Sequence, residues 1–93
     1  MKIPVYSTRF KKEFKLMGKR GYDLGKLMDV ITQLIHENPL PPHNRDHALK
    51  GNYEGFRECH VGGAGDWLLV YKKDNNILVL VLTETGTHAD LFE

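Results

Sequence analysis

The sequence predicts an α+β domain of two layers, in which two helices cover one face of a largely antiparallel sheet. Three observations lead to this fold class. The first half holds two stretches whose apolar residues recur at helical spacing, and the second half holds three short segments typical of strands. The 93 residues have the length of one domain, which we assign to residues 1–93.

The chain opens with a short predicted strand, Ile3–Tyr6, in which Pro4 suits a strand start or a sheet edge. A helix is expected next, because Ser7 or Thr8 can accept a hydrogen bond from its first amides. The apolar positions of this helix are Phe10, Phe14 and Met17.

A second helix is the clearest periodic signal in the chain, and Asp23 is its expected N-terminal cap. Its apolar stripe consists of Leu24, Leu27, Met28, Ile31, Leu34 and Ile35. The helix must end before Pro39, because the residue preceding a proline is pushed out of helical geometry.

The second half is expected to form a loop and then an antiparallel meander. Leu40–Gly51 is the loop, and a loop of this length in a compact domain is often functional. The three strands are Phe56–Val61, Asp66–Lys72 and Ile77–Leu82, with turns at residues 62–65 and 74–76. Residues 83–86 are expected to leave the sheet and residues 87–93 to form a short tail. The sheet face opposite the helices is then free for a ligand.

Composition narrows the class of protein. Hydrophobic residues make up 41% and charged residues 27%, which is ordinary for a globular domain. The single Cys59 allows no intrachain disulfide, so we expect a reducing cytoplasm. The longest apolar run, Ile77–Leu82, is too short to cross a membrane, and no membrane association is expected.

Charge is unevenly distributed along the chain. Residues 1–50 carry ten Lys/Arg against five Asp/Glu, a net +5, whereas residues 51–93 carry three against seven, a net −4. Such asymmetry favours one face for an anionic partner.

Histidines are the most informative polar residues. His36 and His43 are expected on the solvated surface, whereas His47, His60 and His88 lie where loops and strand ends can converge on the free sheet face. The paired ligand spacing that zinc sites usually show is missing, and Cys59 points away from His60 on a strand. We therefore expect neither a metal, nor a cofactor, nor thiol chemistry.

Several histidines without a metal suit cleavage of RNA by its own 2′-hydroxyl, because histidine moves protons near neutral pH. Trp67 or Phe92 could stack on an unpaired base, and Lys50 or Arg57 could hold phosphates. For Trp67 the alternative is a core position, as for most aromatic residues on strands.

Four segments, taken together, resemble the YafQ-type branch of the RelE/ParE toxin superfamily. They are Asp46–Gly51, Gly55–Val61, Asp66–Tyr71 and Gly86–Phe92. The resemblance covers most of the chain and implies a RelE-like fold. It also implies a bacterial type II toxin that cleaves mRNA on the translating ribosome and is neutralised by a cognate antitoxin.

The resemblance assigns roles to six positions. His47 and His60 become candidates for proton transfer, and His88 for acid or base work at the scissile group. Asp66 would orient an imidazole or a nucleotide, and Trp67 and Phe92 would position the RNA. The resemblance does not say which histidine is the base.

Two features depart from the family pattern. The turn between His60 and Asp66 is about two residues longer than in relatives. Glu84 stands where relatives commonly have an arginine, and a carboxylate there opposes phosphate binding, so Arg57 or Lys50 would have to supply the cation.

The first helix is basic, and we expect it to contact ribosomal RNA phosphates, the alternative being a solvated helix face. Its cations are Arg9, Lys11, Lys12, Lys15, Lys19 and Arg20. A rival function is a non-catalytic module that pairs with an antitoxin in a DNA-bound repressor complex, which Glu84 favours. A gyrase poison of the same fold is disfavoured by the histidines.

Overall fold

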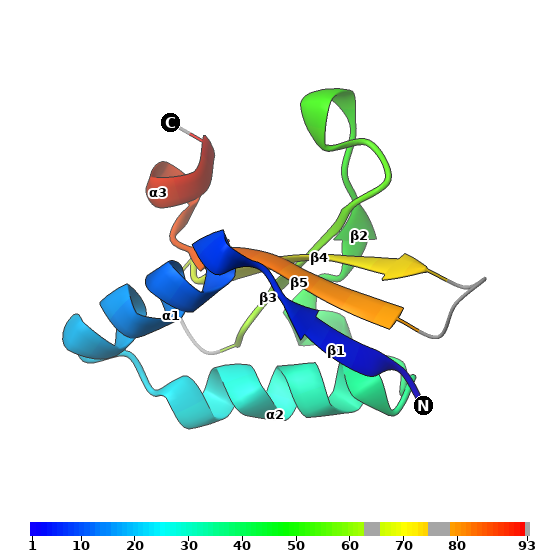
Figure 1. Cartoon of the computed structure of the whole chain (residues 1–93), viewed down its shortest axis with the longest axis horizontal. Helices are drawn as coiled ribbons and strands as arrows, with labels where there is room; N and C mark the ends of the chain where they lie inside the picture. The colour runs from blue at the N-terminus through cyan, green and yellow to red at the C-terminus, as the bar shows by residue number, and fades with distance from the viewer. Residues whose placement is uncertain (63–65, 75–78, 93) are drawn as a thin grey trace.

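The computed structural model of the chain describes residues 1–62, 66–74 and 79–92, and contains a five-stranded sheet with two long helices on one side and a short helix on the other (Figure 1). The sheet order is β1-β5-β4-β3-β2, in which β1 runs parallel to β5 and the other pairs are antiparallel. The strands are β1 (Ile3–Tyr6), β2 (His47–Ala48), β3 (Arg57–His60), β4 (Leu68–Asp74) and β5 (Val79–Gly86). The helices are α1 (Thr8–Lys19), α2 (Leu24–Ile35) and α3 (His88–Phe92).

The predicted first half is confirmed, because its signals are local. The Ser7 hydroxyl accepts a hydrogen bond from the Phe10 amide at 2.9 Å and starts α1. The Asp23 carboxylate accepts one from the Gly25 amide at 3.0 Å and starts α2.

The main core lies between the helices and one sheet face. Its buried members on the helices are Phe10, Met17, Leu27, Val30, Ile31 and Leu34, and those on or beside the strands are Cys59, Val61, Trp67, Leu69, Tyr71 and Leu82. A smaller cluster on the other face contains Leu68, Val70 and Leu91, against which Leu49, Tyr53 and Phe56 pack. The predicted two-layer arrangement is therefore confirmed, with the second face only partly covered.

Helix α1 runs beside the part of β5 that β1 does not reach (Figure 1). β1 ends opposite Leu82, whose carbonyl accepts a hydrogen bond from the Ser7 amide at 3.0 Å. Further along β5, the Glu13 carboxylate accepts a hydrogen bond from the Thr85 amide at 3.2 Å. The backbone amide of the N-cap Ser7 and the side chain of Glu13 thus satisfy the edge of β5 where its strand neighbour has ended.

The second half differs from the expectation in detail. Thr83–Gly86 do not leave the sheet, because they continue β5 and pair with β4 as far as Gly86–Leu68. The expected short tail contains the helix α3. The predicted loop Leu40–Gly51 contains a 3₁₀ turn at Pro42–Asn44 and the short strand β2. The predicted turns at 62–65 and 74–76, and residues 77 and 78 of the third strand, fall largely outside the described residues.

In the part of the chain that the structure describes, none of the helices is long and apolar enough to cross a membrane.

Candidate active site on the open sheet face

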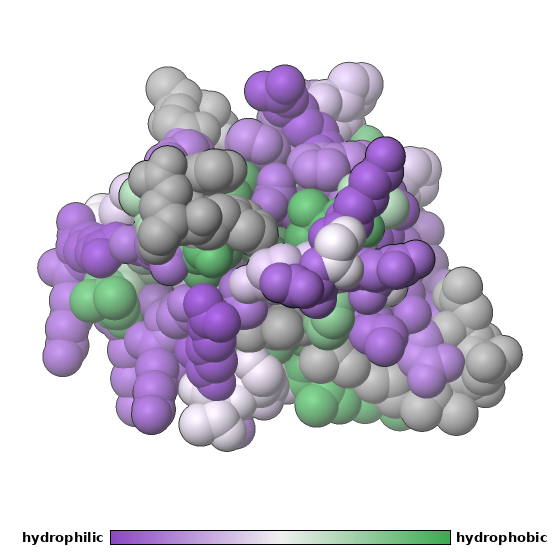
Figure 2. Space-filling model, turned by 90° about the horizontal axis from the view of Figure 1, so that it is seen from above, coloured by the Kyte–Doolittle hydropathy of each residue, from purple (hydrophilic) through white to green (hydrophobic). Residues whose placement is uncertain are grey.

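The sheet face turned away from α1 and α2 carries the candidate site, and we call it the open face. Strand register places His47, Glu58, Val70 and Glu84 in one row across four strands. A second row contains His60, Leu68 and Gly86. Seen from above, apolar atoms lie between hydrophilic rims (Figure 2). In Figure 1, α3 and the segment from β2 to β3 rise above this face on opposite sides.

His47 is held by two acceptors. Its Nδ1 lies 2.6 Å from the Arg45 carbonyl oxygen, and its Nε2 lies 3.4 Å from a Glu58 carboxylate oxygen. The imidazole is about half exposed, whereas Glu58 is buried. The two contacts fix the orientation of the ring.

Glu58 was not predicted as a site residue. Strand alternation over Phe56–Val61 puts Glu58 on the same face as His60, and this was the available signal. A charged residue on a strand is usually solvated, so its burial beside a histidine could not be foreseen.

His60 is half-buried at the end of β3, opposite Leu68. Its backbone carbonyl accepts a 2.7 Å hydrogen bond from the side-chain amide of Asn44, which is itself buried. Asn44 therefore ties the 3₁₀ turn of the long loop to the strand end that carries His60, a second residue that sequence patterns did not reveal.

His88 is the first residue of α3, two positions after the row that contains Gly86 and His60. Thr87 caps this helix with Asp90: the Thr87 amide donates to the Asp90 carboxylate at 2.9 Å, and the Asp90 amide donates to the Thr87 hydroxyl at 3.2 Å. A side chain at Gly86 would approach the Asp90 Cβ to 3.1 Å. The backbone of His88 thus has a defined place at the histidine end of the open face, and Phe92 ends the same helix.

Glu84 is buried on the open face, where the family pattern suggests an arginine. Arg9 Nη1 lies 2.8 Å from one of its carboxylate oxygens, and the Tyr53 hydroxyl donates to the carboxylate at 3.1 and 3.2 Å. Arg9 Nε also contacts Glu13 at 3.3 Å. Burial, ahead of other causes, raises the pKa of both Tyr53 and Glu13.

Trp67 lies in the core, which is the alternative that the sequence offered for an aromatic residue on a strand. Its ring is 7% exposed and meets Tyr22 edge-on at a centroid distance of 5.0 Å. The indole N–H donates to the Thr85 hydroxyl at 2.9 Å, which donates in turn to the Leu68 carbonyl. A role of Trp67 in positioning RNA stays a prediction.

The Arg57 side chain does not lie on the open face. It stands opposite Tyr71, a member of the helix-side core, and therefore points to the other face. Its Nε lies 3.3 Å from Asp46, which also accepts a hydrogen bond from the Tyr71 hydroxyl at 2.5 Å. Arg57 and Asp46 instead close the edge of the sheet.

The other predicted residues lie on the surface. Asp66 is exposed just before β4, and Lys50 is exposed beside the 3₁₀ turn Gly51–Tyr53. Lys11, Lys12 and Lys15 are exposed on α1, and His36 and His43 are exposed as expected. The roles assigned to Asp66, Lys50 and the lysines of α1 stay predictions.

Cys59 is fully buried, and burial raises the pKa of its thiol to about 12. The thiol is therefore protonated and unreactive at neutral pH. Over residues 1–62, 66–74 and 79–92, His, Cys, Asp and Glu form no group of three that could hold a metal ion.

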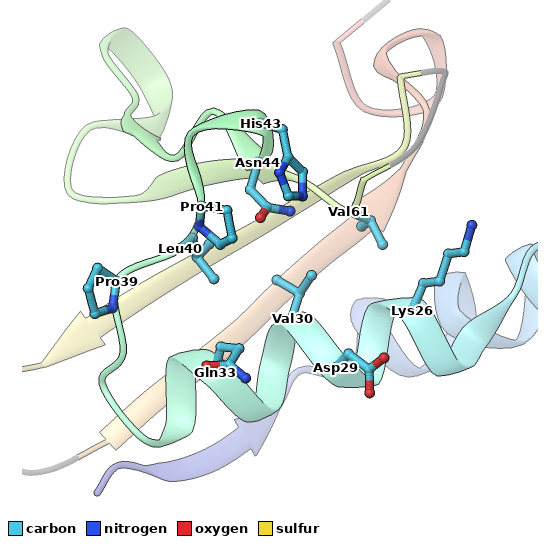
Figure 3. Close-up of a pocket in the computed structure, with 10 residues that line it drawn as sticks. All are labelled: Lys26, Asp29, Val30, Gln33, Pro39, Leu40, Pro41, His43, Asn44 and Val61. Carbon is cyan, nitrogen blue, oxygen red and sulfur yellow. The ribbon is translucent and has the colours of Figure 1, made fainter.

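A separate pocket of about 440 Å³ lies between α2 and the start of the long loop (Figure 3). Lys26, Asp29, Val30 and Gln33 line it from the helix, Pro39, Leu40, Pro41, His43 and Asn44 from the loop, and Val61 from the end of β3. Through Asn44, this pocket adjoins the backbone of His60 without belonging to the open face.

Comparisons with known proteins agree with this geometry. The chain is 42% identical over 88 residues to the mRNA interferase toxin YafQ of Escherichia coli K12, which covers 94% of this chain and 91% of that protein. It matches the YafQ chain in the E. coli DinJ–YafQ complex with a TM-score of 0.88 and 39% identity, over 100% of both chains. It matches a metal-bound toxin from Helicobacter pylori with a TM-score of 0.90 and 40% identity, over 99% of this chain and 100% of that one.

The match to a family model extends over nearly the whole chain. Residues 2–93 fit the family described as the bacterial toxin of type II toxin–antitoxin systems, YafQ. The predicted superfamily and fold are therefore confirmed. The chain belongs to the YafQ family of bacterial toxins of type II toxin–antitoxin systems.

Proposed function

We propose that this chain is an endoribonuclease that cleaves mRNA on its open face, by histidine acid–base catalysis and without a metal. The E. coli relative is named an mRNA interferase. This chain belongs to the same family and is 42% identical to that relative over 88 residues. The observation that carries the proposal is the placement of His47 between the Arg45 carbonyl and the buried Glu58, which lies two residues before His60 on β3.

The reaction needs two proton transfers. The 2′-hydroxyl loses its proton to a base while its oxygen bonds to the neighbouring phosphorus. The bond from phosphorus to the 5′-oxygen breaks, and that oxygen keeps the electron pair and takes up a proton from an acid. The products are a 2′,3′-cyclic phosphate and a 5′-hydroxyl, so neither water nor a redox partner is consumed.

His47 and His60 are proposed for proton transfer, and His88 for acid or base work at the scissile group. The contacts of His47 with the Arg45 carbonyl and with Glu58 orient its ring. Phe92 is proposed to position the RNA. Asp66 is proposed to act from the rim beside β4.

The proposed partners are a cognate antitoxin and the translating ribosome in the cytoplasm. The E. coli relative forms a complex with DinJ, which supports an antitoxin for this chain. The exposed Lys11, Lys12 and Lys15 on α1 support contact with ribosomal RNA phosphates. Reversing these three charges should weaken ribosome binding and flatten its dependence on salt. Unchanged binding and salt dependence would exclude this contact.

The test of catalysis is primer extension on mRNA during translation, with wild-type protein, His88→Ala and His36→Ala. His36 is exposed at the end of α2, away from the open face, and serves as the matched control. Cleavage by the wild type and the control, lost in His88→Ala without loss of folding or antitoxin binding, supports the proposal. A wild type that cuts nothing in any translating system would leave the non-catalytic antitoxin-binding module, which the buried carboxylate of Glu84 favours.

Metal independence needs its own test, because the H. pylori relative was crystallised with a metal. Full cleavage in excess EDTA is expected. Activity that EDTA abolishes and a single divalent ion restores would overturn this part of the proposal.

A further inference from the structure

We propose that Arg9 is the cation that contacts the substrate phosphate on the open face, held there by Glu84. This inference rests on the proposed function and concerns a residue that the family motifs do not include. The open face carries the buried carboxylates of Glu58 and Glu84, which repel a phosphate. Phosphate binding on this face therefore requires a compensating cation, and Arg9 can supply it.

The position of Arg9 follows from how α1 meets the sheet. β1 ends at Tyr6, Ser7 caps α1, and the first turn of the helix therefore stands beside the second half of β5. From this turn Arg9 reaches Glu84, whose neighbours across the sheet are Val70 and then Glu58 beside His47. Adjacent strands are about 4.8 Å apart, so Glu84 stands about 10 Å from Glu58. A ribose–phosphate unit can span that distance.

The contacts of Arg9 fix its guanidinium without burying it. Arg9 Nη1 lies 2.8 Å from a Glu84 carboxylate oxygen, and Arg9 Nε lies 3.3 Å from a Glu13 carboxylate oxygen. Even so, the Arg9 side chain is 52% exposed, whereas that of Glu84 is 6% exposed. A guanidinium has five N–H donors in a planar fork, so it can hold a carboxylate on one edge and a phosphate on another. Glu84 and Tyr53 act here as a support for the cation.

Other cations near this face are placed less favourably. Arg57 points to the opposite face and is engaged by Asp46. Lys72 lies 5.5 Å from the centroid of the Phe56 ring, near the end of the sheet remote from His60 and Gly86. Arg9 is thus a cation whose side chain contacts the row that contains His47, through Glu84.

The experiment compares Arg9→Gln, Glu84→Gln and the double variant, with Lys26→Gln on α2 as the control. Binding is measured to a 2′-O-methyl oligoribonucleotide, which cannot be cleaved, and cleavage is measured on translating mRNA. Arg9→Gln leaves Glu84 buried without its cation, so the decisive comparison is between Glu84→Gln and the double variant, neither of which has that defect.

Arg9→Gln should lower affinity and cleavage about tenfold or more, which corresponds to one charged hydrogen bond, and should reduce the salt dependence of binding. Glu84→Gln should bind at least as tightly as the wild type, because the glutamine oxygen can still accept a hydrogen bond from Arg9 while the negative charge that repels phosphate is gone. The double variant should stay as weak as Arg9→Gln.

Recovery of wild-type affinity and cleavage in the double variant would overturn the proposal, because Arg9 would then serve only to neutralise Glu84. Wild-type behaviour of Arg9→Gln would overturn it as well, while leaving the proposed function intact. A wild type that neither binds nor cleaves would instead refute the proposed function, so the two failures are distinguishable.

Discussion

Arg20 and Asp90, which lie 70 residues apart in the sequence, form an ion pair. Arg20 Nη1 lies 2.7 Å and Nη2 lies 3.3 Å from the two Asp90 carboxylate oxygens. The pair connects the C-terminal cap of α1 to α3, the five-residue helix that starts with His88. A helix this short has no stability of its own, so such external contacts decide whether it stays formed.

Arg20→Gln should loosen α3 without unfolding the protein. An exposed ion pair contributes about 1 kcal/mol or less to global stability, so the urea midpoint should hardly move. Amide exchange at residues 87–91 should nevertheless become faster, and cleavage should fall if His88 acts as proposed. Lys19→Gln, an exposed neighbour without this contact, is the control. Unaltered exchange in Arg20→Gln would show that Leu91 packing alone holds the helix.

The same pair predicts a dependence on acidity. The hydrogen bonds from Arg20, followed by that from the Thr87 amide, lower the pKa of Asp90 to about 2 from an ordinary 3.8. A carboxyl whose pKa is lower in the folded state stabilises that state above pH 3.8 and loses the contribution as pH falls toward 2. The protection factors of the α3 amides, which are corrected for intrinsic exchange at each pH, should therefore fall over this range. Asp90→Asn can keep the cap on Thr87, and should show fast exchange already at pH 5 with little further change.

Trp67 offers a test of its buried position, because it is the one tryptophan of the chain. Its emission should be blue-shifted and poorly quenched by iodide in the folded protein, and RNA should not quench it by stacking. Trp67→Ala should cost about 3–5 kcal/mol of unfolding free energy, as large core truncations do. Strong quenching by a bound oligoribonucleotide would mean that the ring reaches the substrate after all.

The sequence revealed these elements unequally, for physical reasons. Ser7 and Asp23 define α1 and α2 because caps act over two or three residues. Residues 83–86 read as a turn because Thr, Glu and Gly carry no apolar pattern, yet Glu84 and Thr85 are buried by partners from α1 and from the segment between β2 and β3. Such burial depends on contacts distant in sequence, which composition cannot encode.

In the candidate site, too, local sequence patterns revealed some features, whereas contacts distant in sequence determine others. Strand alternation correctly put Trp67, Leu69 and Tyr71 on one face and Glu58 with His60 on the other. The sequence left open whether Trp67 stacks on RNA or packs in the core, and its burial favours the core position. Pairings such as Asn44 with His60 or Arg9 with Glu84 join separate elements and became visible only in the folded chain.

Asn44 should be important for both stability and the site. Asn44→Ala removes a 2.7 Å hydrogen bond and leaves the His60 carbonyl without this partner, at a cost of about 1–3 kcal/mol in urea unfolding. Cleavage by the folded variant should also fall, because the end of β3 is released. His43→Ala, at the exposed neighbouring position, should change neither. Equal stability of Asn44→Ala and the wild type would contradict this role.

Glu58 and His47 should behave as a coupled pair. Glu58→Gln keeps the shape of the side chain but removes the charge 3.4 Å from His47 Nε2. If Glu58 acts through His47, its substitution should lower kcat several-fold, with little effect on KM. It should have almost no further effect once His47 is alanine, because residues that act as a unit are not additive. The measurement is a double-mutant cycle on cleavage of translating mRNA, with urea unfolding of each variant. Additive losses would mean that Glu58 acts on the open face independently of His47.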